Sequence, residues 1–158
     1  MRVGCGFDVH PFGPGDSLVL GGVRVPYSRG IVAHSDGDVL MHALVDALLG
    51  AACLGDIGQH FPDSDPQWRG VESKRFVAHT CQMLERRRFK LINADLTLLA
   101  QSPKIAAWRD QMRYTVAAAL QVSEARVNIK ATTTEHLGFI GRNEGLAAMA
   151  VVLLEADD

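Results

Sequence analysis

The spacing of hydrophobic and polar residues along the chain predicts an order of strands and helices. Residues 2–10 and 18–27 read as extended segments, and the Pro and Gly residues between them turn the chain, which favours a hairpin. Over residues 36–53 the apolar positions recur at intervals of three and four, which predicts a helix with one buried stripe. Ser35 or Asp36 is expected to cap this helix.

The rest of the chain continues with two more helices and three strands. Residues 54–70 are rich in Gly, Asp and Pro, so we expect a long irregular loop, and loops of that length usually carry function. Helices are predicted over residues 72–87 and from Pro103 to about residue 120. The expected strands cover residues 91–99, 127–133 and 146–154.

This order of elements predicts an α+β fold. We expect a two-layer sandwich in which helices cover one face of a mixed β-sheet, with a small N-terminal hairpin beside it. A length of 158 residues suits one domain, so a single domain is expected from residue 1 to 158. The content of 47% hydrophobic and 22% charged residues is that of an ordinary folded protein rather than a disordered one.

Charge, cysteine content and the N-terminal segment narrow the function classes. A net charge of -2 lacks the cationic excess that nucleic-acid binding requires. Three cysteines without CxxC spacing argue against a disulfide framework and a structural zinc knuckle. The N-terminal segment is glycine-rich and charged, and no run reaches about 20 apolar residues. We therefore expect a cytoplasmic protein with neither a nucleic-acid nor a membrane partner.

Three residues form a candidate metal site. Asp8 and His10 are two apart, so on a strand they point to the same side, and His42 adds a ligand from the first helix. Three such ligands leave one position of a tetrahedral zinc ion open, which is typical of catalytic sites. Alternatively, Asp8 accepts backbone hydrogen bonds and His42 is packed. The polar stripe of Asp38, His42 and Asp46 favours the metal, and either acid is expected to orient the imidazole.

Two further segments have the chemistry of phosphate sites. Residues 34–38 lie at a helix entrance, where free N–H groups and the helix dipole favour an anion, although a simple cap explains them too. Residues 132–135 supply three hydroxyls and a carboxylate for phosphate oxygens and Mg²⁺, although threonine also favours strands. Arg142 either reaches an anion or pairs with Glu144.

Five segments in the same order carry a resemblance to a known family. They read GFDVHPFG, GGVRVPY, AHSDGDVLMHALVDALLGAACLGDIGQHFPDSDP, AQSPKI and KATTTEHLGFIGRNEG. On these, the chain resembles, essentially from end to end, the 2-C-methyl-D-erythritol 2,4-cyclodiphosphate synthases of the non-mevalonate isoprenoid pathway. The resemblance implies an enzyme that converts 4-diphosphocytidyl-2-C-methyl-D-erythritol 2-phosphate into the cyclic diphosphate and releases CMP. It also implies a homotrimer with active sites between adjacent subunits.

The resemblance further implies roles for individual residues. Zn²⁺ would be held by Asp8, His10 and His42, Mg²⁺ or Mn²⁺ at the diphosphate by Glu135, and the transition state would be stabilised by His34 and Thr133. The substrate-contacting residues would be Asp8, Val9, His10, His34, Ser35, Asp56, Ile57, Gly58, Phe61, Pro62, Asp63, Ser64, Asp65, Thr132, Thr133, Thr134, Glu135, Phe139 and Arg142. The cytidine moiety would contact Ala100, Gln101, Ser102, Pro103, Lys104, Ile105 and Ala106.

Some positions depart from the family pattern, and two other functions compete with the synthase. The departures are Ser102 and Ala106 in the cytidine segment, and Cys5, Ile140 and Asn143 elsewhere. The first rival is a metal-dependent hydrolase, which would open a diphosphate with water and leave linear products. The second is a non-catalytic trimer that binds a metal or an isoprenoid phosphate on the same scaffold.

Overall fold

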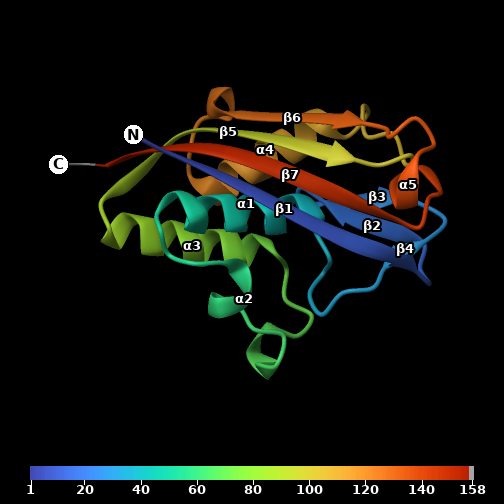
Figure 1. Ribbon diagram of the computed structural model, residues 1–158, viewed down its shortest axis with the longest axis horizontal. Helices are drawn as coiled ribbons and strands as arrows, with labels where there is room; N and C mark the ends of the chain where they lie inside the picture. Colours follow the sequence, from blue (N-terminus) through green and yellow to red (C-terminus); the bar gives the residue numbers. More distant parts are fainter. Residues whose placement is uncertain (157–158) are drawn as a thin grey trace.

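A five-stranded mixed sheet forms one layer of the protein (Figure 1). The computed structural model describes residues 1–156, so the last two residues of the expected 1–158 domain lie outside the described residues. The sheet order is β4-β1-β7-β5-β6, with β5 and β6 parallel and the other neighbours antiparallel. The strands are β1 (Arg2–Gly13), β4 (Gly30–Ile31), β5 (Phe89–Leu99), β6 (Val127–Thr132) and β7 (Gly145–Ala156).

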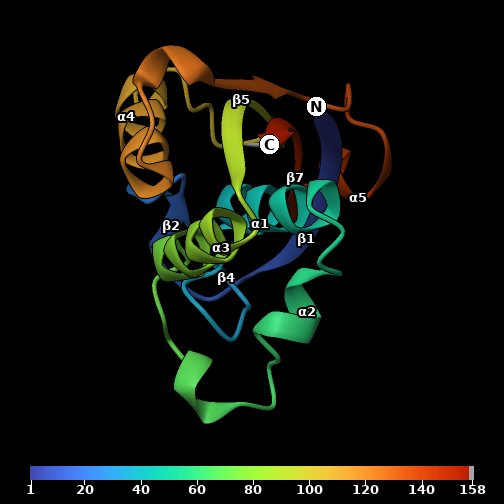
Figure 2. The same cartoon turned by 90° about the vertical axis from the view of Figure 1, so that its left-hand side faces the viewer.

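Three long helices cover one face of this sheet (Figures 1 and 2). They are α1 (Val39–Ala51), α3 (Lys74–Arg86) and α4 (Arg109–Leu120). The short helices are α2 (Ile57–His60) and α5 (Gly138–Gly141), with 3-10 turns at Pro66–Trp68 and Glu124–Arg126. The arrangement confirms the expected α+β sandwich. Among residues 1–156, no helix combines the length and the apolar character that a membrane crossing would require.

A separate two-stranded hairpin lies beside the sheet, but it is not the pairing that the sequence suggested. It joins β2 (Ser17–Leu20) to β3 (Val23–Pro26), whereas β1 pairs with β7 and β4. Apart from Ser17, the hairpin therefore lies within the second extended segment. The reason is the turn Gly21-Gly22, whose φ angles of 56° and 74° suit a two-residue loop that demands positive φ at both positions.

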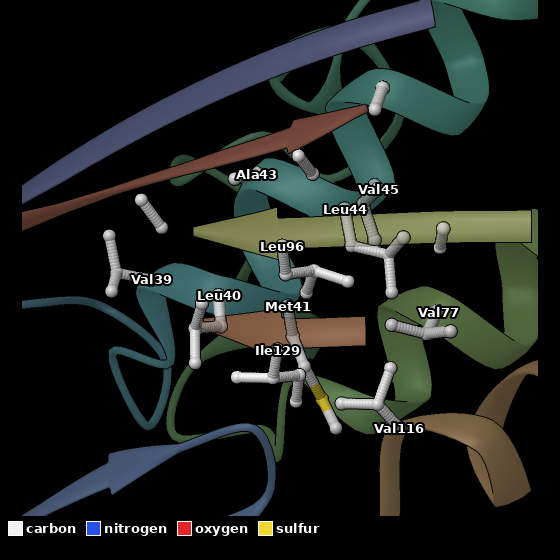
Figure 3. Close-up of a cluster of buried hydrophobic side chains, with 14 of the residues drawn as sticks. Val39, Leu40, Met41, Ala43, Leu44, Val45, Val77, Leu96, Val116 and Ile129 are labelled. Carbon is white, nitrogen blue, oxygen red and sulfur yellow. The ribbon is translucent and has the colours of Figure 1, made fainter. Parts of the chain in front are cut away.

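The hydrophobic core lies between the sheet and the helices, with α1 at its centre (Figure 3). Leu40, Met41 and Leu44 of α1 are fully buried, and the close-up places them with Leu96 of β5 and Ile129 of β6. Strands β1 and β7 contact α1 from one side and α3 contacts it from another. This explains why α1 buries more of its circumference than the single stripe that its spacing predicted.

The start of the third helix and the register of β5 differ from the prediction because tertiary packing overrides local pattern. The third helix begins at Arg109 rather than at Pro103, because residues 100–108 form turns in which Ile105 is buried. In β5 a bulge lies between Leu91 and Asn93, so Leu91 rather than Ile92 takes the buried position. The expected loop of residues 54–70 contains α2 and a 3-10 turn.

The second face of the sheet is uncovered in the single chain. Along β1 the residues that alternate with the helix-facing positions are exposed, among them Val3 at 70%, Phe7 at 54% and Val9 at 43%. Met149 and Val151 of the neighbouring strand β7 are exposed in the same way. The sheet therefore presents a row of large apolar side chains on the side away from the helices.

Candidate functional site

Asp8, His10 and His42 meet where β1 crosses the first turn of α1. The Oδ2 atom of Asp8 lies 3.1 Å from Nδ1 of His42 and 3.1 Å from Nε2 of His10. The two imidazole nitrogens are also 3.1 Å apart. Three atoms that all carry lone pairs thus form an equilateral triangle, and the structure brings together the three ligands that the spacing predicted.

Two glycines explain why a strand and a helix approach closely enough to share a metal site. Gly4 and Gly6 face α1, on the same side of β1 as Asp8 and His10. A Cβ atom added at Gly6 would lie 2.0 Å from a backbone carbonyl oxygen of α1, and the same distance is found for Gly4. The missing side chains let β1 lie directly on the helix, so the next two residues on that face reach His42.

The geometry and the donor types of this triangle fit a zinc ion. Zinc bonds of about 2.0 Å in a tetrahedron place neighbouring ligand atoms about 3.3 Å apart, close to the observed spacing. Octahedral Mg²⁺ would give an edge of about 3.0 Å, so distance alone does not separate the two ions. Two imidazoles with one carboxylate favour zinc, whereas Mg²⁺ prefers oxygen ligands throughout. A fourth position would remain for a ligand oxygen.

The protonation of His10 suits a metal ligand. Burial lowers the pKa of His10 below its ordinary value, while the nearby Asp8 carboxylate acts in the opposite direction. The first effect is the larger, so the imidazole is held in the neutral form at neutral pH. Neutral imidazole is the form that binds metals, because its second nitrogen keeps a free lone pair.

The residues that orient His42 are not the acids that the sequence suggested. Asp38 bonds to backbone N–H groups and Asp46 accepts from the N–H of Ile57 at 3.2 Å, so neither carboxylate contacts the imidazole. The Nε2 atom of His42 lies instead 2.8 Å from Oγ of Ser73 and 3.1 Å from Oγ of Ser35. That part of the prediction is wrong, because both carboxylates accept hydrogen bonds from backbone N–H groups instead.

Asp38, rather than Ser35 or Asp36, caps α1 and ties the hairpin to it. Its fully buried carboxylate accepts hydrogen bonds from the N–H groups of Met41 (3.2 Å), Gly21 (2.9 Å) and Gly22 (2.6 Å). Burial raises the pKa of Asp38 to about 6, and the Asp36 carboxylate adds to this while the three N–H groups oppose it. The carboxylate of Asp38 is therefore already the anion at the N-terminus of α1.

A cavity of about 560 Å³ opens in front of the metal triangle, a size suited to a small-molecule ligand. It brings together the predicted residues Asp8, His10, His34, Ser35, His42, Ile57, Gly58, Phe61, Pro62 and Asp63. Sequence reasoning missed Val32, Ala33, Trp68, Arg69 and Phe76, which line the same cavity. In the structure the rings of Phe61 and Phe76 lie 4.8 Å apart and anchor the loop to α3.

Three predicted loop residues do not line this cavity. The carboxylate of Asp56 caps α2 through the N–H of Gln59 at 3.0 Å, and it also accepts from the side chain of Gln59. Asp65 caps the following 3-10 turn through the N–H of Gln67 at 3.0 Å. Ser64 lies between them and is exposed. Val9, on β1, faces the opposite side of the sheet from the metal ligands.

A second cavity, of about 250 Å³, lies where β5 and β6 end, on the other side of the sheet from β1. Its walls are the predicted Ala100, Pro103, Lys104, Ile105, Ala106, Thr132 and Thr133, together with Ala131 and Arg109, which sequence reasoning missed. Gln101 and Ser102 belong to the same turn but do not line the cavity. The segment predicted to bind a cytidine moiety thus meets two of the threonines from the end of β6.

The two cavities lie at the same end of the sheet but are well separated. Val9 pairs with Ala147, Ala147 with Leu99 and Leu99 with Thr132, so one row crosses the sheet from β1 to β6. Three steps between neighbouring strands amount to about 14 Å. The metal triangle and the threonine segment of one chain are therefore too far apart to contact one diphosphate.

The remaining predicted residues lie outside both cavities. Glu135 is exposed, and its Oε1 atom accepts a hydrogen bond from Oγ1 of Thr133 at 3.2 Å; Thr134 bonds to a backbone carbonyl nearby. Arg142 donates from Nε to Glu144 at 2.7 Å, and this contact raises the pKa of Arg142 and lowers that of Glu144. Phe139, in α5, is 41% exposed. Thr134, Glu135, Phe139 and Arg142 thus line neither of the two cavities described above.

Comparisons with known proteins cover the whole chain. Residues 1–155 match the YgbB family. The 2-C-methyl-D-erythritol 2,4-cyclodiphosphate synthase of Stutzerimonas stutzeri is 56% identical over 98% of both chains. The protein of the same name from Pseudomonas aeruginosa is 55% identical over 99% of both chains.

Solved structures extend the likeness to the fold. The bifunctional IspDF of Campylobacter jejuni matches with a TM-score of 0.95 and 46% identity over 99% of this chain, which spans 42% of that longer chain. The CDP complex of IspF from Plasmodium falciparum matches with a TM-score of 0.87 and 31% identity, over 99% of this chain and 97% of that one. The likeness therefore extends over nearly the whole fold of this chain.

Proposed function

The chain belongs to the YgbB family of 2-C-methyl-D-erythritol 2,4-cyclodiphosphate synthases, and from this premise we propose how its residues perform the reaction. It is a metal-dependent lyase that converts 4-diphosphocytidyl-2-C-methyl-D-erythritol 2-phosphate into the cyclic diphosphate for isoprenoid biosynthesis. An oxygen of the 2-phosphate forms a bond to the β-phosphorus. The bond from that phosphorus to the oxygen shared with the α-phosphorus breaks, and CMP leaves with that oxygen.

The observation that carries the proposal is the triangle of lone-pair atoms from Asp8, His10 and His42. These residues would hold Zn²⁺, which supplies Lewis-acid polarisation of a phosphate oxygen when bound. The triangle is supported by two elements, a strand and a helix, which are distant in sequence. The other residues of the proposed site would then position the substrate and compensate its charge.

Residues at the mouth of the larger cavity would orient the methylerythritol part and its phosphate. His34 lies there with Nε2 3.9 Å from Oδ2 of Asp63, and its largely exposed imidazole is free to donate to a phosphate oxygen. Ser35 offers a hydroxyl beside it. Together with residues 56–65 they would fold the substrate so that the 2-phosphate meets phosphorus in line, and such proximity is worth roughly 7 to 11 kcal/mol in good cases.

The smaller cavity would bind the cytidine moiety, with Glu135 nearby as a ligand for Mg²⁺ or Mn²⁺ at the diphosphate. Relatives at 31% and 40% identity have been solved with CDP, which supports a site for a cytidine diphosphate on this fold. Lys104 and Arg109 add two cations to the cavity wall. Thr133, on the same wall, would stabilise the transition state through its hydroxyl.

We also propose a homotrimer in which one subunit's metal triangle faces the cytidine cavity of the next. Two observations support it: the separation of about 14 Å between the two regions within one chain, and the uncovered apolar face of β1 and β7. A rotationally closed ring would bury this face and complete every site. The proposal includes a single domain over residues 1–158 and a cytoplasmic location.

One assay separates this proposal from its rivals. Purified protein incubated with the cytidyl substrate, Zn²⁺ and Mg²⁺ should release CMP and form the cyclic diphosphate in equal amounts. Linear phosphate products would instead identify a hydrolase. Zinc binding without turnover at high protein concentration would identify a binding protein. Sedimentation should give a mass three times that of the 17.1 kDa chain.

A further inference from the structure

We infer that Ser73 and Asp36 are positioning residues that fix the tautomer and orientation of His42 and thereby set the affinity of the metal site. The inference rests on the proposed function only in taking zinc as the metal. Ser73 immediately precedes α3 and is fully buried, although it makes no cap hydrogen bond to that helix. Its hydroxyl is committed instead to two side chains that are distant in sequence.

The direction of the hydrogen bonds follows from the groups involved. The Oγ of Ser73 makes a short hydrogen bond to Oδ1 of Asp36, and the N–H of Ser73 donates to Oδ2 of the same carboxylate at 3.0 Å. A carboxylate has no proton to donate, so the hydroxyl proton of Ser73 must point at Asp36. The lone pairs of Ser73 Oγ remain free to accept.

The hydrogen bond from the Ser73 hydroxyl to Asp36 decides which nitrogen of His42 carries the proton. Since Oγ of Ser73 can only accept, the contact of 2.8 Å requires a proton on Nε2 of His42. Nδ1 then presents its lone pair to the metal triangle with Asp8 and His10. Metal-binding histidines generally donate their second N–H in this way, and the partner fixes both tautomer and ring orientation.

Ser35 does not replace Ser73 in this role. Its Oγ lies 3.1 Å from the same Nε2 atom and accepts from the N–H of Gly37 at 3.2 Å. No carboxylate contacts this hydroxyl among the residues that the structure describes, so it can rotate and suits either tautomer. Only the serine that is bonded to Asp36 imposes a direction on the imidazole.

Backbone hydrogen bonds attach the segment before α1, which carries Asp36, to the end of the loop that lines the larger cavity. Asp36 donates its N–H to the carbonyl of Val71 at 3.2 Å, and the N–H of Gly70 donates to the carbonyl of His34 at 2.8 Å. Replacing Ser73 by alanine removes the hydroxyl but leaves these backbone bonds, including its own N–H bond to Asp36. The substitution Ser73→Ala therefore tests the hydroxyl alone.

The experiment measures zinc affinity of the full-length protein by competition with a chelator. Ser73→Ala and Asp36→Asn should each bind zinc about 10- to 100-fold more weakly than wild type. The matched control is Thr80→Val, which removes a buried hydroxyl within α3 that has no hydrogen-bond partner in the described chain. This control should stay within about twofold of wild type. Wild-type affinity in Ser73→Ala, or an equal loss in Ser35→Ala alone, would overturn the assignment.

A spectroscopic readout keeps the inference testable if one variant folds poorly. In zinc-loaded wild type, ¹⁵N-edited spectra should show the His42 proton on Nε2, protected from exchange with water. That protection should disappear in both Ser73→Ala and Asp36→Asn, and a proton found on Nδ1 of wild type would refute the inference. If wild type neither binds zinc nor forms the cyclic product, the proposed function fails. If it does both while the variants keep their affinity, only the positioning role fails.

Discussion

The larger cavity, beside Asp8, His10 and His42, and the smaller one, which we propose binds cytidine, are held in place by different chemistry; they are called the metal cavity and the cytidine cavity below. Around the metal cavity, the carboxylates of Asp36, Asp38 and Asp46 accept hydrogen bonds from backbone N–H groups on several elements. Beside the cytidine cavity, the support is neutral. The Nδ2 atom of Asn143 donates to Oη of Tyr27 at 3.0 Å, and Oγ of Ser102 donates to Oδ1 of Asn143 at 3.1 Å.

The neutral support is a closed ring. Oη of Tyr27 lies 2.8 Å from Oγ of Ser102, and because the Ser102 proton is used on Asn143, Tyr27 must donate. Ser102 and Asn143, two positions that were expected from the sequence to depart from the family pattern, thus bond to each other. Asn143 sits at a φ of 60°, which asparagine tolerates better than most residues. The comparison teaches that one cavity should respond to pH and the other should not.

The largest effect is expected from removing a metal ligand. Asp8→Asn should lower turnover by roughly a thousandfold, because Lewis-acid polarisation is worth several kcal/mol and each 1.4 kcal/mol is a factor of ten. The cytidine cavity lies on other strands, so CMP binding should change by less than about twofold. Elemental analysis and a turnover assay test the loss at the metal site. Calorimetric CMP titration tests whether CMP binding is unchanged. Unchanged zinc content would contradict the ligand assignment.

Mixing two inactive variants tests whether the cavities of different subunits cooperate. Glu135→Gln should keep its zinc but lose about a hundredfold in turnover, because a charge-neutralising group is lost. When Asp8→Asn and Glu135→Gln subunits are unfolded together and reassembled at equal amounts, about a quarter of the sites should regain both groups. Turnover should rise to roughly that fraction of wild type. If the mixture stays as inactive as its parents, the sites do not span subunits.

The pH dependence of the two supports should differ. The pKa of Asp38 is about 6 in the folded chain against 3.8 as its ordinary value, so the folded state binds more protons between these pH values. Its stabilising contribution is complete below about pH 4 and is lost as pH rises through 6, a change of about 3 kcal/mol. The free energy of unfolding in urea should be measured for wild type and for Asp38→Asn across this pH range. The difference between the two proteins should change by this amount. A flat difference from pH 4 to 7 would contradict it.

The smallest effect is expected from opening the neutral ring. Tyr27→Phe and Asn143→Gly should each cost about 1 kcal/mol, the worth of a neutral hydrogen bond, and weaken CMP binding about fivefold without altering zinc content. Since the residues share one ring, the double variant should lose less than the sum. Tyr114→Phe, at a tyrosine that is 62% exposed, is the control and should bind CMP as wild type does. Additive losses would exclude a ring.

Local patterns predicted what depends on neighbours in the sequence. Alternation along β1 placed Asp8 and His10 on one side, and helical spacing placed His42 on α1, so the metal triangle followed from the two periods. The role of Ser73 did not follow, because it depends on a contact between residues 31 apart. The cap at Asp38 was missed because the helix was expected to begin at residue 36, whereas it begins at Val39.

The assembly of subunits is harder to predict from sequence patterns than any single contact within the chain. The threonine segment was predicted as a phosphate site, and its exposed position after β6 leaves that interpretation as a proposal. Nothing in its composition shows that about 14 Å of sheet separates it from the metal triangle; that follows from the strand order. Strand order is set by long-range pairing, which hydrophobic periods do not encode.

The glycines at positions 4 and 6 make this enzyme vulnerable at a distance from its chemistry. Neither residue would touch metal or substrate, yet even a methyl group at either one would collide with the backbone of α1 and drive the helix away from the strand. In a random-mutagenesis screen for zinc-deficient protein, substitutions at these two codons should be recovered beside those at the ligands themselves. A survey limited to the residues around the metal site would judge such substitutions harmless.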